Sequence, residues 1–262
     1  MNRITERLDA LKAKNEKAFI TYMTAGLPDM QGTVNIIKAQ ADAGVDVIEL
    51  GVPFSDPVAD GPVIQDASYK SILKGTNLAK TFDAVAEARR ECQVPIIFMM
   101  YYNTILYYGV EKFVDKCIAV GVDGLIIPDL PYEEQYEIKR FLAKEGAPKL
   151  IPLVSPVSGD RLPMILKEAE GFVYCVSSMG VTGQAADFHK NVRAYLETVK
   201  AQSPVPVMMG FGIRTAADVE PLKDTLDGCI VGSAFIRLME ENNYDLGKIS
   251  EYIQTFKAEL NK

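Results

Sequence analysis

The sequence is poor in the side chains that hold metals and form disulfides. It has one histidine, His189, and four scattered cysteines, Cys92, Cys117, Cys175 and Cys229, with no Cys-x-x-Cys pair. Protein-held zinc needs clustered thiolates and imidazoles, so we expect no metal site. Three of the cysteines lie in or beside apolar segments, which indicates buried reduced thiols rather than disulfides, and therefore a cytoplasmic protein.

Long apolar runs and basic blocks are also missing. No run approaches the ~18 residues that a membrane span needs, and the segment Met1–Leu8 is charged and amphipathic, unlike a secretory signal. The net charge is −7 without a basic block, which argues against nucleic acid as a partner. A single small phosphate is still compatible, because backbone amides can hold it. We therefore expect neither a membrane nor a nucleic-acid partner.

Apolar runs alternate with amphipathic stretches along the whole chain. The sequence has 262 residues, 48% of them hydrophobic, and this length suits two domains or one large α/β barrel. The candidate strands are Ala18–Thr24, Val45–Leu50, Pro95–Met100, Gly124–Pro128, Leu150–Val154, Phe172–Val176, Val205–Met209 and Cys229–Val231. The candidate helices are residues 2–14, Thr33–Ala43, Val63–Lys74, Leu78–Cys92, Val110–Val120, Glu133–Glu145, Pro163–Glu170, Ala216–Lys223 and Leu246–Leu260.

This alternation predicts parallel βαβ units. Eight units match a (β/α)₈ TIM barrel with an extra N-terminal helix and an added helix after the second strand. No linker divides the chain, so we expect one domain over residues 1–262. A doubly wound open sheet is the alternative, but it usually has fewer strands, and no Gly-x-Gly-x-x-Gly follows the first run. Glycines such as Gly44, Gly121, Gly146 and Gly228 are placed to end helices in the left-handed region.

The stretch from Glu49 to Pro62 joins a buried strand end to a rigid loop that holds a second acid, Asp60. An acid among Val, Phe and Pro side chains is poorly hydrated, which raises its pKa. An acid in a more polar position stays ionised, and such a pair can divide acid and base work. The alternative is a surface loop whose acids are solvated or cap helices.

Glycine-rich loops follow the last three strands. Gly210–Arg214 and Gly232–Ser233 occupy the positions where this fold often holds a phosphate, and Ser233 is placed to cap a helix. Residues 177–184, with Thr182 and Gly183, have the pattern of a lid. We expect His189, just beyond, on a solvent-facing turn without a catalytic role.

Apolar groups at other strand ends can form a flat pocket for an aromatic ligand. They are Tyr22, Tyr101, Ile126 and Tyr174. Ordinary layers of the barrel core are the alternative for each of them taken singly.

The sequence Glu-Leu-Gly-Val-Pro-Phe-Ser-Asp-Pro-Val-Ala-Asp-Gly-Pro, at 49–62, resembles that of the tryptophan synthase alpha subunit family. The loops at 180–183, 210–213 and 232–233 resemble the family's phosphate loops in order and spacing. The resemblance implies retro-aldol cleavage of indole-3-glycerol phosphate to indole and glyceraldehyde 3-phosphate.

The resemblance also implies roles for single residues. Glu49 matches the general acid, and Asp60 matches the carboxylate that binds the indole N–H. The implied phosphate ligands are Gly183, Phe211, Gly212, Gly232 and Ser233; Thr182 and the four apolar groups at the strand ends are the implied substrate pocket. The chain has Ser178-Met179 where many relatives carry Arg, so their lid-closing contacts are not carried over.

A beta subunit that holds pyridoxal phosphate is the implied partner, in an α₂β₂ heterotetramer, and this chain would need no cofactor of its own. The positions that match the partner-facing surface are Pro53, Asp56, Pro57, Asn103, Asp129 and Pro131. The alternatives to this lyase are another phosphosugar isomerase or lyase that uses the same loops, and a ligand-sensing regulatory subunit. Neither needs an acid dedicated to a ring N–H.

Overall fold

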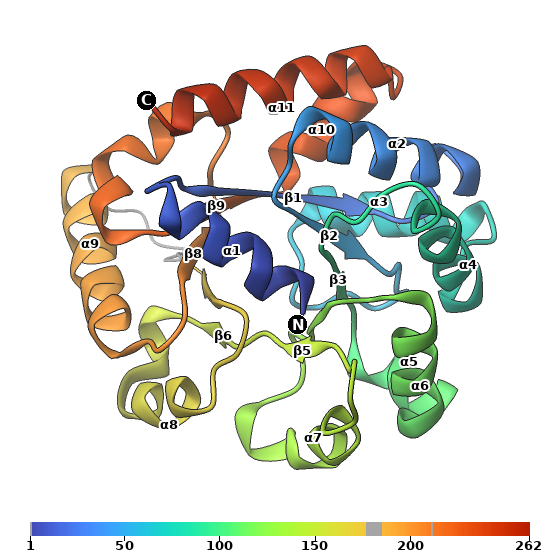
Figure 1. The fold of residues 1–262 in the computed structure, drawn as a ribbon, viewed down its shortest axis with the longest axis horizontal. Coiled ribbons are helices and arrows are strands. Elements are labelled where there is room, and N and C mark those ends of the chain that lie inside the picture. Colours follow the sequence, from blue (N-terminus) through green and yellow to red (C-terminus); the bar gives the residue numbers. More distant parts are fainter. Residues whose placement is uncertain (1, 177–184, 211) are drawn as a thin grey trace.

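The strands form a closed ring with helices packed outside it (Figure 1). The computed structural model describes residues 2–176, 185–210 and 212–262. Within these ranges nine parallel strand segments lie in the order β5-β4-β3-β2-β1-β9-β8-β7-β6. They are β1 (Ala18–Thr24), β2 (Val47–Gly51), β3 (Ile96–Met99), β4 (Gly124–Ile126), β5 (Lys149–Leu150), β6 (Leu153–Val154), β7 (Val173–Val176), β8 (Val207–Gly210) and β9 (Gly228–Val231).

Helices alternate with these strands. The α-helices are α1 (Arg3–Ala13), α2 (Met30–Ala43), α3 (Pro62–Leu73), α4 (Leu78–Ala88), α5 (Tyr102–Tyr108), α6 (Val110–Val120), α7 (Tyr136–Leu142), α8 (Leu162–Lys167), α9 (Ala185–Gln202), α10 (Ser233–Glu241) and α11 (Leu246–Leu260). The 3₁₀ turns are η1 (Tyr132–Glu134), η2 (Pro156–Arg161), η3 (Ala216–Asp218) and η4 (Glu220–Thr225). The expected (β/α)₈ barrel is confirmed, with α1 as the extra N-terminal helix and α3 as the added helix after β2.

The ring closes at residues 149–154, where one stretch of chain pairs on both sides. Its first half, β5, pairs with β4, and its second half, β6, pairs with β7. The Ile151 N–H donates to the Leu125 carbonyl at 2.9 Å, and the Tyr174 N–H donates to the Pro152 carbonyl at 3.0 Å. Pro152 has no N–H to donate, which divides the fifth strand of the barrel into two short segments.

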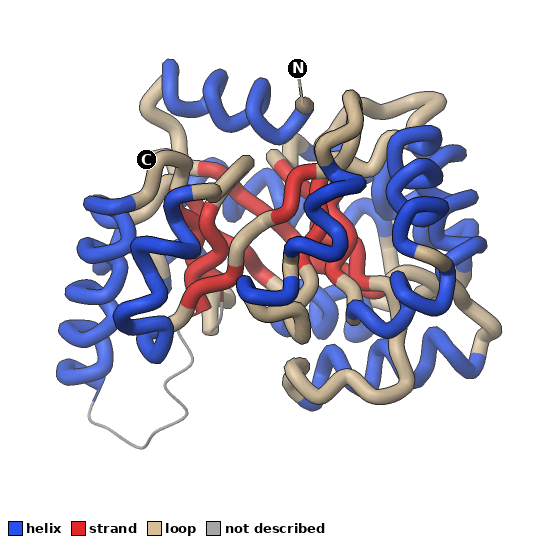
Figure 2. The backbone as a smooth tube through the Cα atoms, turned by 90° about the horizontal axis from the view of Figure 1, so that it is seen from below, coloured by secondary structure: helices blue, strands red, loops and turns tan. Residues whose placement is uncertain are grey.

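Alternate side chains of the strands point into the barrel. With Ile4, Leu8 and Leu11 of α1, the inward set forms one buried cluster: Ala18, Ile20, Val47, Ile97, Ile126, Ile151, Phe172, Met208 and Ile230. The opposite faces pack against the helices in a second cluster. Because both faces of each strand are covered, the strands read as continuous apolar runs. Figure 2 shows α1 lying across one end of the barrel, the end at which the strands begin.

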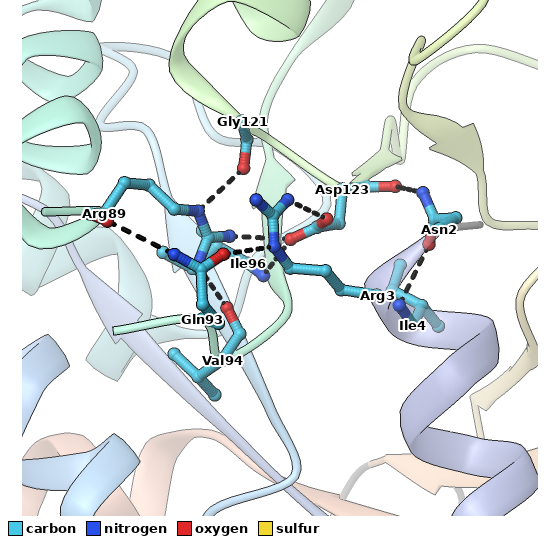
Figure 3. A network of polar contacts seen from close by, with 9 residues as sticks. All are labelled: Asn2, Arg3, Ile4, Arg89, Gln93, Val94, Ile96, Gly121 and Asp123. Carbon is cyan, nitrogen blue, oxygen red and sulfur yellow. Dashed lines mark hydrogen bonds and ion pairs between the residues drawn. The ribbon is translucent and has the colours of Figure 1, made fainter. Parts of the chain in front are cut away.

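Buried aspartates hold α1 in place. Asp123, just before β4, is 3% exposed. Its carboxylate accepts hydrogen bonds from Arg3 Nη1 at 2.9 Å and Arg89 Nη2 at 2.6 Å, and from the Ile96 backbone N–H at 2.9 Å (Figure 3). This network joins the N-terminal helix to the starts of β3 and β4.

The same arrangement recurs before β2. Asp46 is fully buried and accepts from the Phe19 backbone N–H at 2.8 Å. Arg7 of α1 and Lys257 of α11 pair with it at 2.6 and 2.7 Å. Both aspartates are therefore satisfied by cations and by a strand-start amide, as buried charges must be.

Some expected elements differ from the structure. The helix expected at Ala216–Lys223 is wrong: the segment forms η3 and η4, because Pro221 interrupts regular α-helical bonding. Glu133–Glu145 is likewise shortened to η1 and α7. His189 lies within α9 and not on a turn. Gly228 begins β9 rather than ending a helix; a Cβ there would meet the Ala18 carbonyl at 2.4 Å, so it permits close strand packing.

We expect Asp123→Asn to lower the free energy of unfolding by about 3 to 5 kcal/mol, because it leaves two guanidinium groups without a buried counter-charge. Urea titration measures the change. The matched control is Asp224→Asn, since Asp224 is 70% exposed in its pair with Arg193, and such pairs contribute about 1 kcal/mol or less. Equal losses in the two variants would contradict a structural role for the Asp123 network.

Candidate active site

A cavity of about 530 Å³ opens at the carboxyl ends of the strands. This is the end of a (β/α)₈ barrel that carries active sites. The cavity brings together residues from five regions of the sequence that were singled out above: Tyr22, Glu49, Asp60, Tyr174, Gly212, Gly232 and Ser233. No group of three or more His, Cys, Asp or Glu side chains among the described residues is arranged to hold a metal ion.

Glu49 projects into the barrel from β2, opposite Tyr22 of β1 in the sheet register. It is 1% exposed, and neither carboxylate oxygen has a hydrogen-bond partner within the described part of the chain. Burial, together with the nearby charge of Asp60, raises the Glu49 pKa to about 8. The site therefore holds this side chain as a protonated acid at neutral pH.

Asp60 lies in the loop between β2 and α3, where a tyrosine supports it. Tyr101 Oη donates to Asp60 Oδ2 at 3.1 Å and accepts from the Ala59 N–H at 2.9 Å. Phe54 stacks on the Tyr101 ring, with 5.0 Å between centroids. Burial raises the Asp60 pKa to about 6, and the Tyr101 hydrogen bond opposes that rise. Asp60 is thus largely ionised at the pH at which Glu49 is protonated.

Two tyrosines form apolar walls of the cavity, each seated against a strand-end glycine. A Cβ on Gly51 would meet Tyr22 Oη at 2.1 Å, and a Cβ on Gly210 would meet Tyr174 Oη at 2.2 Å. These glycines therefore leave the space that the rings occupy. Burial raises the pKa of both phenols, so their hydroxyls stay neutral at the edge of the cavity.

The other side of the cavity is lined by backbone. Gly232 is the N-cap of α10, and no side chain caps the helix. Ser233 is therefore the first helical residue; the expectation that it caps the helix is wrong, because the cap position has no side chain. The first-turn amides have no partner within the helix and suit an anion. Gly212, with φ +76°, borders the same space.

The remaining candidate residues have different positions. Tyr101 lies behind Asp60 and supports it rather than lining the cavity. Ile126 belongs to the inner apolar layer of the barrel, consistent with the core alternative for this position. Gly183, Thr182 and Phe211 lie outside the described residues.

The six candidate partner-facing residues lie in loops and a helix after β2, β3 and β4, at the carboxyl end of the barrel. Pro53 and Pro57 are half-buried, and Asp56, Asn103, Asp129 and Pro131 are exposed. Asp129 also has a local role: its Oδ1 accepts from the Tyr102 N–H at 2.9 Å, at the start of α5.

Sequence reasoning missed several lining residues. Ile64 comes from α3, Ser155 follows β6, and Arg237 lies on α10. Arg214 ends a glycine loop that was singled out above, but no role was expected of its side chain. Arg237 could have been found from its spacing, since it follows Ser233 by one helical turn. Ser155 carries no comparable signal.

A (β/α)₈ barrel with an acid pair and open helix amides around one cavity defines an enzyme of the phosphate-binding barrel class. The family model for the tryptophan synthase alpha chain matches residues 8–262. The tryptophan synthase alpha chain of Lachnospira eligens is 62% identical over 263 residues and covers 100% of both chains. That of Alkaliphilus metalliredigens is 43% identical, covering 97% of this chain and 96% of the relative.

Solved structures agree with the sequence relatives. Tryptophan synthase subunit alpha from Legionella pneumophila superposes with a TM-score of 0.90 at 34% identity, covering 99% of this chain and 98% of that one. A chain of tryptophan synthase from M. tuberculosis gives a TM-score of 0.88 at 32% identity, covering 99% and 98%. The chain belongs to the tryptophan synthase alpha chain family. It is a lyase of tryptophan biosynthesis that acts on indole-3-glycerol phosphate.

The buried acid makes stability depend on pH. The Glu49 pKa rises from 4.5 to about 8 on folding, so between these values the folded state binds more protons than the unfolded state. Stability therefore falls as pH rises through this window, by at most about 1.4 kcal/mol per pH unit. Glu49→Gln removes this contribution. We expect its stability relative to wild type, from urea titration, to increase between these pH values; a constant difference would contradict the shifted pKa.

The contact between Tyr22 and Gly51 can be tested by adding a methyl group at position 51. Gly51→Ala is expected to displace Tyr22 into the cavity and weaken indole binding by about 1 to 3 kcal/mol, the usual cost of overpacking. Binding is measured by equilibrium dialysis. In a Tyr22→Ala background the added methyl has room, so its effect should largely disappear. An equal loss in both backgrounds would show that Tyr22 is not the obstacle.

Proposed function

We propose that Glu49 is the general acid for indole-3-glycerol phosphate cleavage and Asp60 its electrostatic partner. Glu49 donates its proton to C3 of the indole, which converts the ring into an electron-poor indolenine. Asp60 accepts a hydrogen bond from the ring N–H and stabilises the positive charge that develops there. The observation that carries this assignment is an unpartnered, buried carboxyl with a raised pKa beside an ionised one in a single cavity.

The bond between C3 and the glycerol chain then breaks, and its electron pair returns to the indole ring. The glycerol hydroxyl becomes the carbonyl of glyceraldehyde 3-phosphate and gives its proton to the Glu49 carboxylate. Indole leaves, and Glu49 ends protonated as it began. Proton transfer by a positioned group contributes ~10²–10⁴-fold to such a step.

The apolar ring of the substrate fits the tyrosine-lined side of the cavity, and its phosphate fits the glycine-lined side. Gly212, Gly232 and Ser233 line that side, and the helix amides behind them favour an anion. Gly183 and Phe211 are proposed as further phosphate ligands and Thr182 as a pocket residue, from the family resemblance.

We also propose that the chain works in the cytoplasm, as one domain and as the alpha subunit of an α₂β₂ heterotetramer. The six partner-facing residues named above would contact the beta subunit, which would hold pyridoxal phosphate and receive the indole. This proposed contact is supported by the position of the six residues, which lie at the end of the barrel where the cavity opens. The reaction above uses only side chains and amides, so it needs no cofactor in this chain.

Glu49→Gln and Asp60→Asn test the assignment. Without its acid, Glu49→Gln should lose ~10²–10⁴-fold in turnover but keep its affinity for inorganic phosphate. Asp60→Asn should lower turnover by a smaller factor. Indole release is followed by fluorescence, with and without a beta subunit, since the chain has no tryptophan to mask the signal.

The matched control is Glu259→Gln, on the exposed side of α11, which should behave like wild type. Undiminished turnover in Glu49→Gln would exclude Glu49 as the acid. A wild-type chain that binds phosphate but never releases indole would instead favour the regulatory alternative.

A further inference from the structure

Two arginines line the cavity and have no part in the chemistry described so far. Arg214 follows the glycine loop after β8, and Arg237 lies on α10. Arg237 is four residues after Ser233, so both project from the same side of the helix. Both arginines therefore lie beside the glycine loops that line the cavity.

Arg237 has no hydrogen bond or ion pair within the described part of the chain. Glu240, an acid on the same helix, is engaged elsewhere: it pairs with Lys70 of α3 at 2.8 Å. Asp218 is a charged neighbour of Arg214, but its Oδ2 already accepts backbone N–H bonds from Arg214 and Thr215 at 2.9 Å.

Cations in the other large cavity are matched by acids. That cavity, of about 1080 Å³, lies toward the opposite end of the barrel, beside α1, α7 and α8. There Lys139 pairs with Glu168 at 2.8 Å, and Lys149 pairs with Glu170. An unpaired guanidinium therefore distinguishes the candidate active site from this other cavity.

The charge of the ligand explains this arrangement. A phosphate monoester carries about −1.5 to −2 charges at neutral pH, in a chain whose net charge is −7 and in a cavity that holds the Asp60 carboxylate. The first turn of α10 supplies only about half a positive charge. A guanidinium near the start of α10 offsets the remaining repulsion between the phosphate and the acidic groups.

We propose that Arg237, assisted by Arg214, recognises the phosphate of the substrate and makes the site selective for a phosphorylated over an unphosphorylated indole compound. This inference rests on the proposed function, because it assigns the phosphate to the glycine-lined side of the cavity. Both side chains are solvent-exposed, so their effect depends on ionic strength.

The test uses Arg237→Gln, Arg237→Lys and Arg214→Gln/Arg237→Gln. The matched control is Arg90→Gln, since Arg90 is exposed just beyond α4, away from the cavity. Dissociation constants for inorganic phosphate and for neutral indole are measured separately by equilibrium dialysis, at low and high salt. KM and kcat for indole-3-glycerol phosphate are measured under the same conditions.

Arg237→Gln should weaken phosphate binding and raise KM by about three- to tenfold at low salt, with a larger effect in the double variant and little in Arg237→Lys. High salt should reduce the difference, and indole affinity and kcat should not change. Unaltered phosphate affinity, an equal loss in Arg90→Gln, or a parallel loss of indole affinity would overturn the inference. If the wild-type chain releases no indole but Arg237→Gln still weakens phosphate binding, the proposed reaction is excluded, while phosphate recognition by Arg237 stands.

Discussion

The site depends on one carboxyl group that has been taken out of water without a partner. An ionised carboxylate in such a position is costly, and the chain avoids most of that cost by keeping Glu49 protonated, with a pKa of about 8. The surrounding fold imposes this state. The inner apolar layer closes the barrel beneath Glu49, and tyrosine rings and apolar strand ends surround it. No cation among the described residues pairs with it. A basic neighbour would lower the pKa and remove the available proton.

Buried acids at the other end of the barrel, unlike Glu49, are paired with cations. Asp46 and Asp123 are as buried as Glu49, but each has two cationic partners and accepts a strand-start N–H. Asp227, before β9, repeats the pattern by accepting from the Val207 N–H at 2.8 Å and pairing with Lys200. Fully partnered acids fix the starts of the strands and the position of α1. The unpartnered acid lies at the carboxyl ends. The barrel thus separates groups that provide stability from the groups that we propose provide the chemistry.

Much of this was predictable because it is encoded in local patterns. Continuous apolar runs located every strand, and the Gly-Val-Asp sequences marked strand starts at Asp46 and Asp123, although not their cationic partners, which come from residues distant in sequence. The Glu49–Pro62 segment indicated the acid pair because its composition already describes a poorly hydrated loop.

The support of Asp60 by Tyr101 and Phe54 was not predictable, since it joins two loops through tertiary packing. The η3–η4 segment was misjudged because helical spacing outweighed the effect of Pro221 in the prediction. Arg237 was missed because a charged residue on an amphipathic helix is normally solvent-facing, although its spacing of one helical turn from Ser233 indicated that both lie on the same side of the helix.

The two acids also influence each other during the proposed reaction. The charge of Asp60 contributes to the raised Glu49 pKa, so Glu49 holds its proton until a substrate ring is present. When the ring N–H gains positive charge beside Asp60, the local negative potential falls and the protonated ring is stabilised. Glu49 is then an unpartnered carboxylate in an apolar cavity, a state that the free site disfavours. The same burial that made it a weak acid now makes it a strong base toward the glycerol hydroxyl. One buried carboxyl can therefore serve both proton transfers, because its environment favours return to the protonated form.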